Sequence, residues 1–181
     1  MKLNYFGIVG AILAFVSIAL PWWTVSVSAG IAGGTGNWYL YNAGTYGTGL
    51  NLWYDWLALL LVILGGITGL AGSIIPNVKK MLIGGGILAL LSIIIFAVGL
   101  QNDLSSHTSP LGVSLNIFSS SSFSIYGFSY SYSTYLSFGF WLALVAAIIM
   151  LVAMRYPKPT PEAPSPLPSQ PPPPPPSTPG T

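Results

Sequence analysis

Charged residues are so scarce in this chain that most soluble folds are excluded. Among the 181 residues, only 4% are Asp, Glu, Lys or Arg, whereas 52% are hydrophobic. A soluble globular domain devotes about a quarter of its residues to charged side chains. The net charge of +2 provides no basic field for binding nucleic acid. Together with a mean hydropathy of +0.71, this composition predicts an integral membrane protein.

Four apolar stretches have the length of about 20 residues that a membrane-crossing helix needs. We expect the spans at about 3–23, 54–75, 81–100 and 135–154. Pro76 ends the second stretch and only a few residues separate it from the third, so these two helices should be antiparallel neighbours. The sequence therefore predicts an all-α membrane protein, a bundle of four transmembrane helices over residues 1–156.

The positive charges indicate how this bundle is oriented. With four crossings, all five fall on one side of the membrane: Lys2, Lys79, Lys80, Arg155 and Lys158. The loops at 24–53 and 101–134 contain no Lys or Arg. Because cytoplasmic loops carry the excess of positive charge, we expect a multi-pass protein of the cell membrane with both termini cytoplasmic. The alternative is that the first apolar run is a cleaved signal peptide, which would leave three spans.

Aromatic residues flank the predicted spans, as is typical of membrane–water interfaces. The expected anchors at the outer interface are Trp22, Trp23, Trp53 and Trp56. Asp55 lies beside Trp56, and we interpret it as an interfacial charge or helix cap. Contact with an ion or ligand is the alternative for this carboxylate.

Small residues four positions apart predict the faces on which the helices pack, because membrane helices associate through close backbone approach. The predicted helix-packing residues are Gly65, Gly69, Ser73, Gly85 and Ala89. Packing within one bundle is the simpler interpretation, and homo-oligomerisation through one of these faces is the alternative.

The two outer loops show the alternation of apolar and polar residues that is typical of strands. In the first loop, we expect a strand over 25–31, a turn over 33–36 and a strand over 37–41. In the second loop, alternation over 111–117 resumes after the serine run 119–122, with Gly127 as a bulge. The sequence thus predicts a small extracellular antiparallel sheet, with one face against the outer helix ends. Flexible loops are the alternative. The candidate contact residues of these loops are Trp38, Tyr39, Tyr41, Phe128 and Tyr130.

The residue types that are rare or missing in this chain argue against metal binding and catalysis. The chain has no cysteine and a single histidine, His107, so thiolate sites and multi-histidine metal sites are excluded. No acidic residue lies in the middle of a predicted span, as a proton relay would require. We therefore expect no enzymatic activity, no cofactor and no metal.

The segment 157–181 is rich in proline, which favours an extended, disordered cytoplasmic tail. We interpret it as a solvated spacer, with a docking site for a cytoplasmic partner as the alternative. The uncharged exterior suits an acidic medium, where carboxylates are protonated. This composition favours an archaeal or viral source.

The layout resembles the claudin and peripheral-myelin-protein family of four-helix membrane proteins. The resemblance rests on topology, on Pro21-Trp22-Trp23-Thr24-Val25-Ser26 after the first helix, and on Gly36-Asn37-Trp38. The paired loop cysteines of that family are absent. The resemblance implies a structural or adhesive role through loop-to-loop contacts, with Trp38 and its aromatic neighbours as contact residues.

These observations favour a non-enzymatic, multi-pass membrane protein with a structural or interaction role. Its expected partners are the lipid bilayer, a second copy of the chain, or another membrane or surface-layer protein. An accessory subunit of a larger transport or respiratory complex is the first alternative. A small oligomeric channel or transporter is the second, disfavoured by the lack of buried charge.

Overall fold

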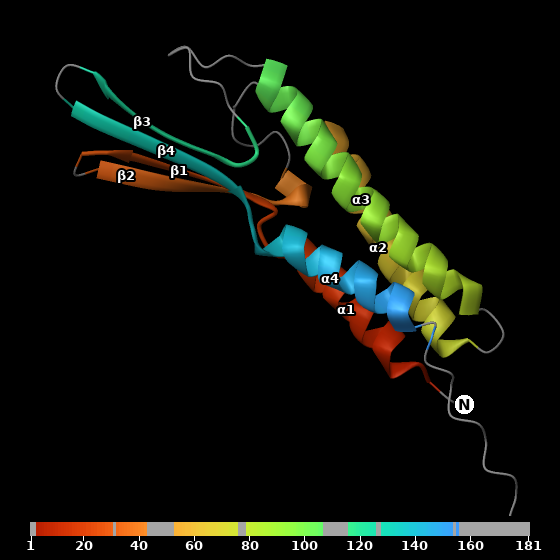
Figure 1. Ribbon diagram of the computed structural model, residues 1–181. Coiled ribbons are helices and arrows are strands. Elements are labelled where there is room, and N and C mark those ends of the chain that lie inside the picture. Colours follow the sequence, from red (N-terminus) through yellow and green to blue (C-terminus); the bar gives the residue numbers. More distant parts are fainter. Residues whose placement is uncertain are drawn as a thin grey trace, which may run out of the picture.

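The computed structural model describes residues 3–30, 32–42, 53–75, 79–106, 116–125, 128–153 and 155. In chain order, its elements are α1 (Tyr5–Ile18), β1 (Trp23–Ala29), β2 (Ala32–Trp38), the 3-10 turn η1 (Leu40–Asn42), α2 (Trp53–Ile74), α3 (Lys79–Ser106), β3 (Ser119–Ile125), β4 (Phe128–Leu136) and α4 (Phe138–Ala153). The helices form a bundle, and the strands form a sheet that leaves one end of it (Figure 1).

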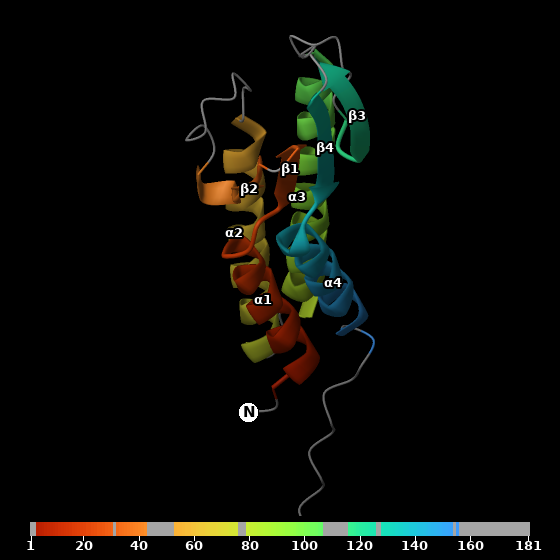
Figure 2. The same cartoon turned by 90° about the vertical axis from the view of Figure 1, so that its left-hand side faces the viewer.

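The four helices surround a common axis. Helix α1 packs against α2 and α4, and α3 packs against the same two helices from the opposite corner (Figure 2). The N-terminal end of the chain lies at the end of the bundle opposite the sheet (Figure 1). Helices α2 and α3 are long and apolar enough to cross a membrane, whereas α1 and α4 are apolar but shorter.

The first and last helices are shorter than the spans expected at 3–23 and 135–154. Asn4 caps α1, because its side-chain oxygen accepts a hydrogen bond from the Gly7 amide at 3.2 Å. The chain then leaves the helix before Pro21, whose ring cannot continue the backbone hydrogen bonds. At the other end, Tyr135 and Leu136 belong to β4. Both differences arise because residues next to the helices pair in the sheet.

The second and third helices lie close to their expected positions. Helix α2 runs over Trp53–Ile74, against the predicted 54–75. Helix α3 extends beyond the predicted 81–100 and ends at Ser106. Its last turns are polar, so hydropathy alone places the end of this helix too early.

Small residues lie where the helices of the bundle approach one another most closely. A Cβ atom added at Gly85 on α3 would lie 2.7 Å from the Gly65 carbonyl oxygen and 2.7 Å from the Gly69 nitrogen on α2. The backbones of these two helices are therefore in direct contact. Large apolar side chains point outward from all four helices, among them Ile12, Ile67, Ile94 and Ile148.

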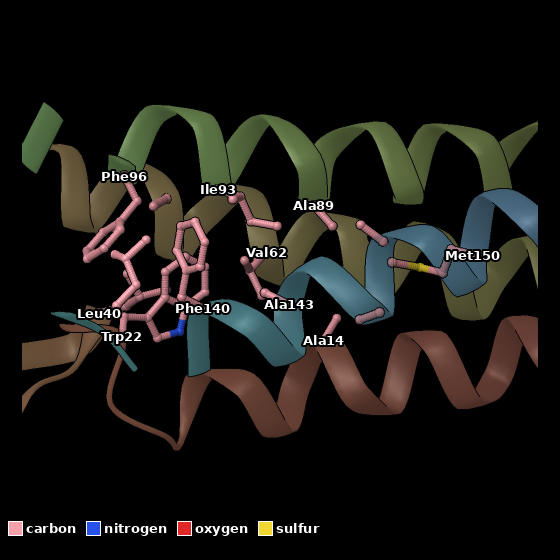
Figure 3. Close-up of a cluster of buried hydrophobic side chains, with 14 of the residues drawn as sticks. Ala14, Trp22, Leu40, Val62, Ala89, Ile93, Phe96, Phe140, Ala143 and Met150 are labelled. Atoms are coloured by element: carbon pink, nitrogen blue, oxygen red, sulfur yellow. The ribbon is translucent and has the colours of Figure 1, made fainter. Parts of the chain in front are cut away.

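An aromatic cluster closes the bundle at the end that carries the sheet (Figure 3). The Trp22 ring lies edge-on to Phe96 and Phe140, with centroids 5.1 Å and 5.9 Å away. Its indole nitrogen donates a hydrogen bond to the Ser17 carbonyl at 2.9 Å. Leu40 of η1 is fully buried beside these rings. The first loop thus inserts a side chain into the helical core.

The sheet has the strand order β2-β1-β4-β3, and each adjacent pair is antiparallel. Strand β1 follows α1 and β4 precedes α4, so the central pair continues two neighbouring helices (Figure 2). Trp23 of β1 is paired with Trp38 of β2 and Leu136 of β4. The prediction that the two loops form an antiparallel sheet is confirmed.

The expected turns within this sheet are wrong. Residues 33–36, predicted as a turn, belong to β2, and the serine run 119–122 belongs to β3. The first hairpin turns instead near Gly30, which has a positive φ of 59°. Pairing with β1 and β4 holds these glycines and serines in strands despite their weak intrinsic preference for them. Gly127 and most of 111–117 lie outside the described residues.

Only the inner end of the sheet is buried, which corrects the expectation that a whole face covers the helices. Trp23, Thr24, Thr134 and Leu136 are buried where the strands leave the bundle. Towards the hairpin ends, residues on both faces become exposed, including Val27 and Ser28. We call β1–β4 the projecting sheet.

Candidate functional site

The projecting sheet has two chemically different faces, because successive side chains of a strand point to opposite sides. In β1, Ser26 and Ser28 lie on one side, and Val25 and Val27 lie on the other. The register extends both sets across the sheet. None of the residues in the four strands is charged. Any contact made by this surface therefore depends on hydroxyl groups and aromatic rings.

Hydroxyl groups line up in rows across the strands. Ser26 is directly paired with Thr35 of β2 and Ser133 of β4, and Ser133 is paired in turn with Ser120 of β3. The Ser26 and Thr35 hydroxyl oxygens lie 3.4 Å apart. A second row joins Gly33, Ser28, Ser131 and Ser122. We call this side the hydroxyl face.

A shallow groove of about 630 Å³ crosses the four strands at these rows. Its lining residues come from every strand of the projecting sheet: Ser26, Val27, Ser28, Gly33, Gly34, Thr35, Ser120, Ser121, Ser122, Ser131, Tyr132 and Ser133. A ligand site typically occupies about 300–1,000 Å³. The groove therefore has the dimensions of a binding site, with hydroxyl groups as its main polar lining.

The opposite side of the projecting sheet, the aromatic face, carries Val27 and several rings. Phe123 and Tyr130 are a directly paired residue couple whose rings stack with centroids 5.5 Å apart. Phe128 lies further towards the hairpin end and is 65% exposed. Two of the predicted contact residues, Phe128 and Tyr130, thus share one face.

The other predicted contact residues lie near the bundle. Trp38 is half-buried, and its ring lies 4.8 Å from that of Trp23. Tyr39 and Tyr41 flank Leu40, with ring centroids 5.3 Å apart, and Tyr41 is exposed. These residues form a separate aromatic surface at the base of the sheet, so the structure divides the predicted set into two groups.

The predicted interface anchors also divide into two groups. Trp53 and Trp56 are more than half exposed, at one end of α2. Trp22 and Trp23 are buried instead, which corrects their interpretation as interfacial anchors. Trp22 packs against Phe96 and Phe140 inside the bundle, and Trp23 lies at the buried end of β1 against Trp38.

The interpretation of Asp55 as an interfacial charge is also corrected. Its side chain is only 2% exposed, so it is not an interfacial charge in contact with water. It lies in the first turn of α2, with the Asp103 side chain of α3 nearby. Tyr54 is buried beside both acids. Among the described residues, no group of three or more His, Cys, Asp or Glu side chains is placed to hold a metal ion.

The predicted helix-packing residues all lie inside the bundle. Gly65 faces the backbone of Gly85 and Ala89, and Gly69 faces Met150 and Ala11. Ser73 is buried, with its hydroxyl donating a hydrogen bond to the Gly69 carbonyl at 2.7 Å. These residues therefore contact other helices of the same chain.

The groove residues were not among the sequence-predicted sites. Their signal is present as the serine at every second position of 129–133 and at 26 and 28. Isolated strands do not show which serines become neighbours, because that depends on the register between segments far apart in the sequence. His107 and the tail 157–181 lie outside the described residues.

No family model, curated protein sequence or solved structure matches this chain.

Proposed function

We propose that this chain is a non-enzymatic membrane protein whose helical bundle holds the projecting sheet outside the membrane for contact with a partner. The proposal rests on one observation: the molecule has two chemically different surfaces, one on the bundle and one on the projecting sheet. Apolar side chains cover the outside of the bundle, while the projecting sheet is uncharged and exposed on both faces.

The distribution of side-chain size supports a bundle surrounded by lipid. A soluble protein buries most of its large apolar side chains. This bundle has glycine, alanine and serine at many of its buried positions and exposes large apolar side chains such as Ile67, Ile94 and Ile148. Lipid tails are as apolar as these side chains, so packing of small residues drives association in a membrane. The same surface in water would expose far more apolar area than a soluble monomer tolerates.

The shorter helices are compatible with this proposal because backbone groups at their junction with the sheet are hydrogen-bonded within the protein. At 1.5 Å per residue, α1 and α4 are about 21 Å and 24 Å long, less than the hydrocarbon thickness of about 30 Å. Where α1 and α4 meet the sheet, the Gly139 amide donates to the Pro21 carbonyl at 2.8 Å, and the Ser137 amide donates to the Trp22 carbonyl at 2.9 Å. Non-helical backbone at membrane depth requires such partners.

The proposed orientation of the protein in the membrane rests on the position of its positive charges. Lys79 and Lys80 begin α3 at the end of the bundle opposite the sheet (Figure 1). The positive-inside rule therefore assigns that end to the cytoplasm and the projecting sheet to the exterior. A claudin-like role in contacts between surfaces is part of this proposal.

Site-specific photo-crosslinking in intact membranes tests the proposal. We expect a photoreactive amino acid at Phe128, on the aromatic face, to crosslink to a partner of defined mass. The same reagent at Ile94, on the outside of α3, should crosslink to lipid. A protein partner captured at Ile94 and none at Phe128 would favour the accessory subunit of a larger complex. Crosslinks only to a second copy from helix positions would favour the oligomeric channel.

A further inference from the structure

We propose that the groove on the hydroxyl face binds an uncharged glycan chain. This inference rests on the proposed function in one respect, because it requires the projecting sheet to face the exterior. It adds a ligand class and a binding face distinct from the aromatic face.

The lining of the groove defines the chemistry of its ligand. A serine hydroxyl both donates and accepts a hydrogen bond, and sugar hydroxyls do the same. Ser28, Ser120, Ser122 and Ser131 are exposed, so their hydroxyls are accessible. Because the strands contain no charged residue, a phosphate, sulfate or carboxylate ligand would find no counter-charge in the groove. An uncharged polyhydroxyl ligand matches this lining.

The register sets these hydroxyls at regular intervals. Neighbouring strands are about 4.8 Å apart, so the row from Thr35 to Ser120 spans about 14 Å. Alternate residues of one strand, such as Ser131 and Ser133, are about 7 Å apart on the same face. A repeating ligand can therefore make the same contact at successive positions, which a single small molecule cannot.

The two open ends of the groove favour a ligand of several linked sugars over a single terminal sugar. The lining includes both edge strands, Gly33–Thr35 in β2 and Ser120–Ser122 in β3. A ligand chain can therefore enter at one edge of the projecting sheet and leave at the other. Tyr135 is paired with Thr24, two residue pairs beyond the Ser26–Ser133 pair and on the same face, and it is 43% exposed. Its ring supplies an apolar surface beside the hydroxyl rows.

Binding of the purified full chain in lipid nanodiscs to an array of neutral oligosaccharides tests the proposal. The array contains gluco-, manno- and galacto-oligosaccharides of one to six residues, with sulfated and sialylated glycans for comparison. We expect binding that strengthens with chain length and excludes the charged glycans. The double variant Ser131→Val and Ser133→Val should weaken binding about tenfold or more, because it removes two hydrogen-bonding groups from the groove.

The matched control is Ser124→Val with Ser129→Val. These two serines are a directly paired couple on the same face but outside the groove, so their loss should leave binding unchanged. Valine favours strands, and an unaltered melting temperature in both double variants establishes that the sheet is retained.

Three results would overturn the proposal: no neutral glycan binds, both double variants lose binding equally, or vesicles bearing a single-sugar glycolipid bind as well as the longer oligosaccharides. The proposed function is tested separately. If the Ser131→Val and Ser133→Val variant loses glycan binding but keeps the Phe128 crosslink, the two faces act independently. If only the Phe128 crosslink fails, the result contradicts the proposed function but not glycan binding by the groove.

Discussion

The helical bundle brings its helices together on small residues and exposes many large apolar side chains on its outer surface. The projecting sheet exposes hydroxyl groups and aromatic rings along strands that are buried only at one end. In the bundle, the backbones are in direct contact at Gly65 and Gly85, so there is no space for a larger side chain at either position. In the outer half of the projecting sheet, side chains such as Phe128 are largely exposed. The comparison teaches that tight packing and exposed side chains are confined to different parts of the chain.

The largest effect should follow from enlarging a glycine between helices. A side chain at Gly85 would overlap backbone atoms of α2 that cannot move independently, so we expect Gly85→Leu to prevent formation of the folded bundle. The control is Gly84→Leu, because no atom lies within 4 Å of a Cβ added at Gly84. Size-exclusion chromatography in detergent measures both. Equal yields of folded protein would contradict the packing of α2 on α3.

Truncation of the aromatic cluster should produce the next largest effect. Trp22→Ala removes a fully buried ring and its hydrogen bond to the Ser17 carbonyl. Such truncations destabilise by about 3–5 kcal/mol. Trp53→Ala removes a ring that is 60% exposed and should change stability far less. Thermal unfolding followed by tryptophan fluorescence compares the two, and a similar melting temperature for both would show that the cluster does not hold the two regions together.

A single positive charge distinguishes the environments of the bundle and the projecting sheet. Ile94 lies near the middle of α3 and is 56% exposed. If lipid surrounds it, Ile94→Lys should oppose membrane insertion by about 2.5–3.5 kcal/mol. Ser124→Lys places the same charge on the sheet and should be tolerated within about 0.5 kcal/mol. The fraction of protein that resists alkaline extraction from membranes provides the measurement. Unimpaired insertion of the Ile94→Lys variant would contradict a lipid-facing bundle.

The smallest effect on stability should come from the aromatic face. Phe128→Ser removes an exposed ring near the end of a hairpin, and we expect the melting temperature to change little because surface substitutions contribute within about 0.5 kcal/mol. Partner contact, measured by crosslinking from the neighbouring Tyr130 position, should fall. A large loss of stability with unchanged crosslinking would assign Phe128 a structural role instead.

Much of the helical architecture can be predicted from the sequence. Long apolar runs identify α2 and α3, and glycines at 65, 69 and 85 indicate where their backbones meet. The ends of α1 and α4 cannot be predicted in this way. The predicted spans include Trp23, Tyr135 and Leu136, whereas strand pairing between β1 and β4 decides the conformation of these residues.

The sheet and its groove are less accessible to sequence reasoning. Alternation in the two loops predicts strands, but glycine and serine runs resemble turns until a partner strand is known. Asp55 shows a similar limit, because a charge beside tryptophans suggests the interface, whereas the tertiary packing of α2 and α3 buries it. In each case, contacts between distant segments override the local pattern.

The central claim is that the bundle crosses the membrane and holds the projecting sheet on the outer side. The chain contains no cysteine, so a single introduced cysteine reports one position without a background. In intact cells, an impermeant thiol reagent should label Ser131→Cys, and it should label Lys80→Cys only after the membrane is broken. Labelling of Lys80→Cys in intact cells, with Ser131→Cys protected until lysis, would contradict this account.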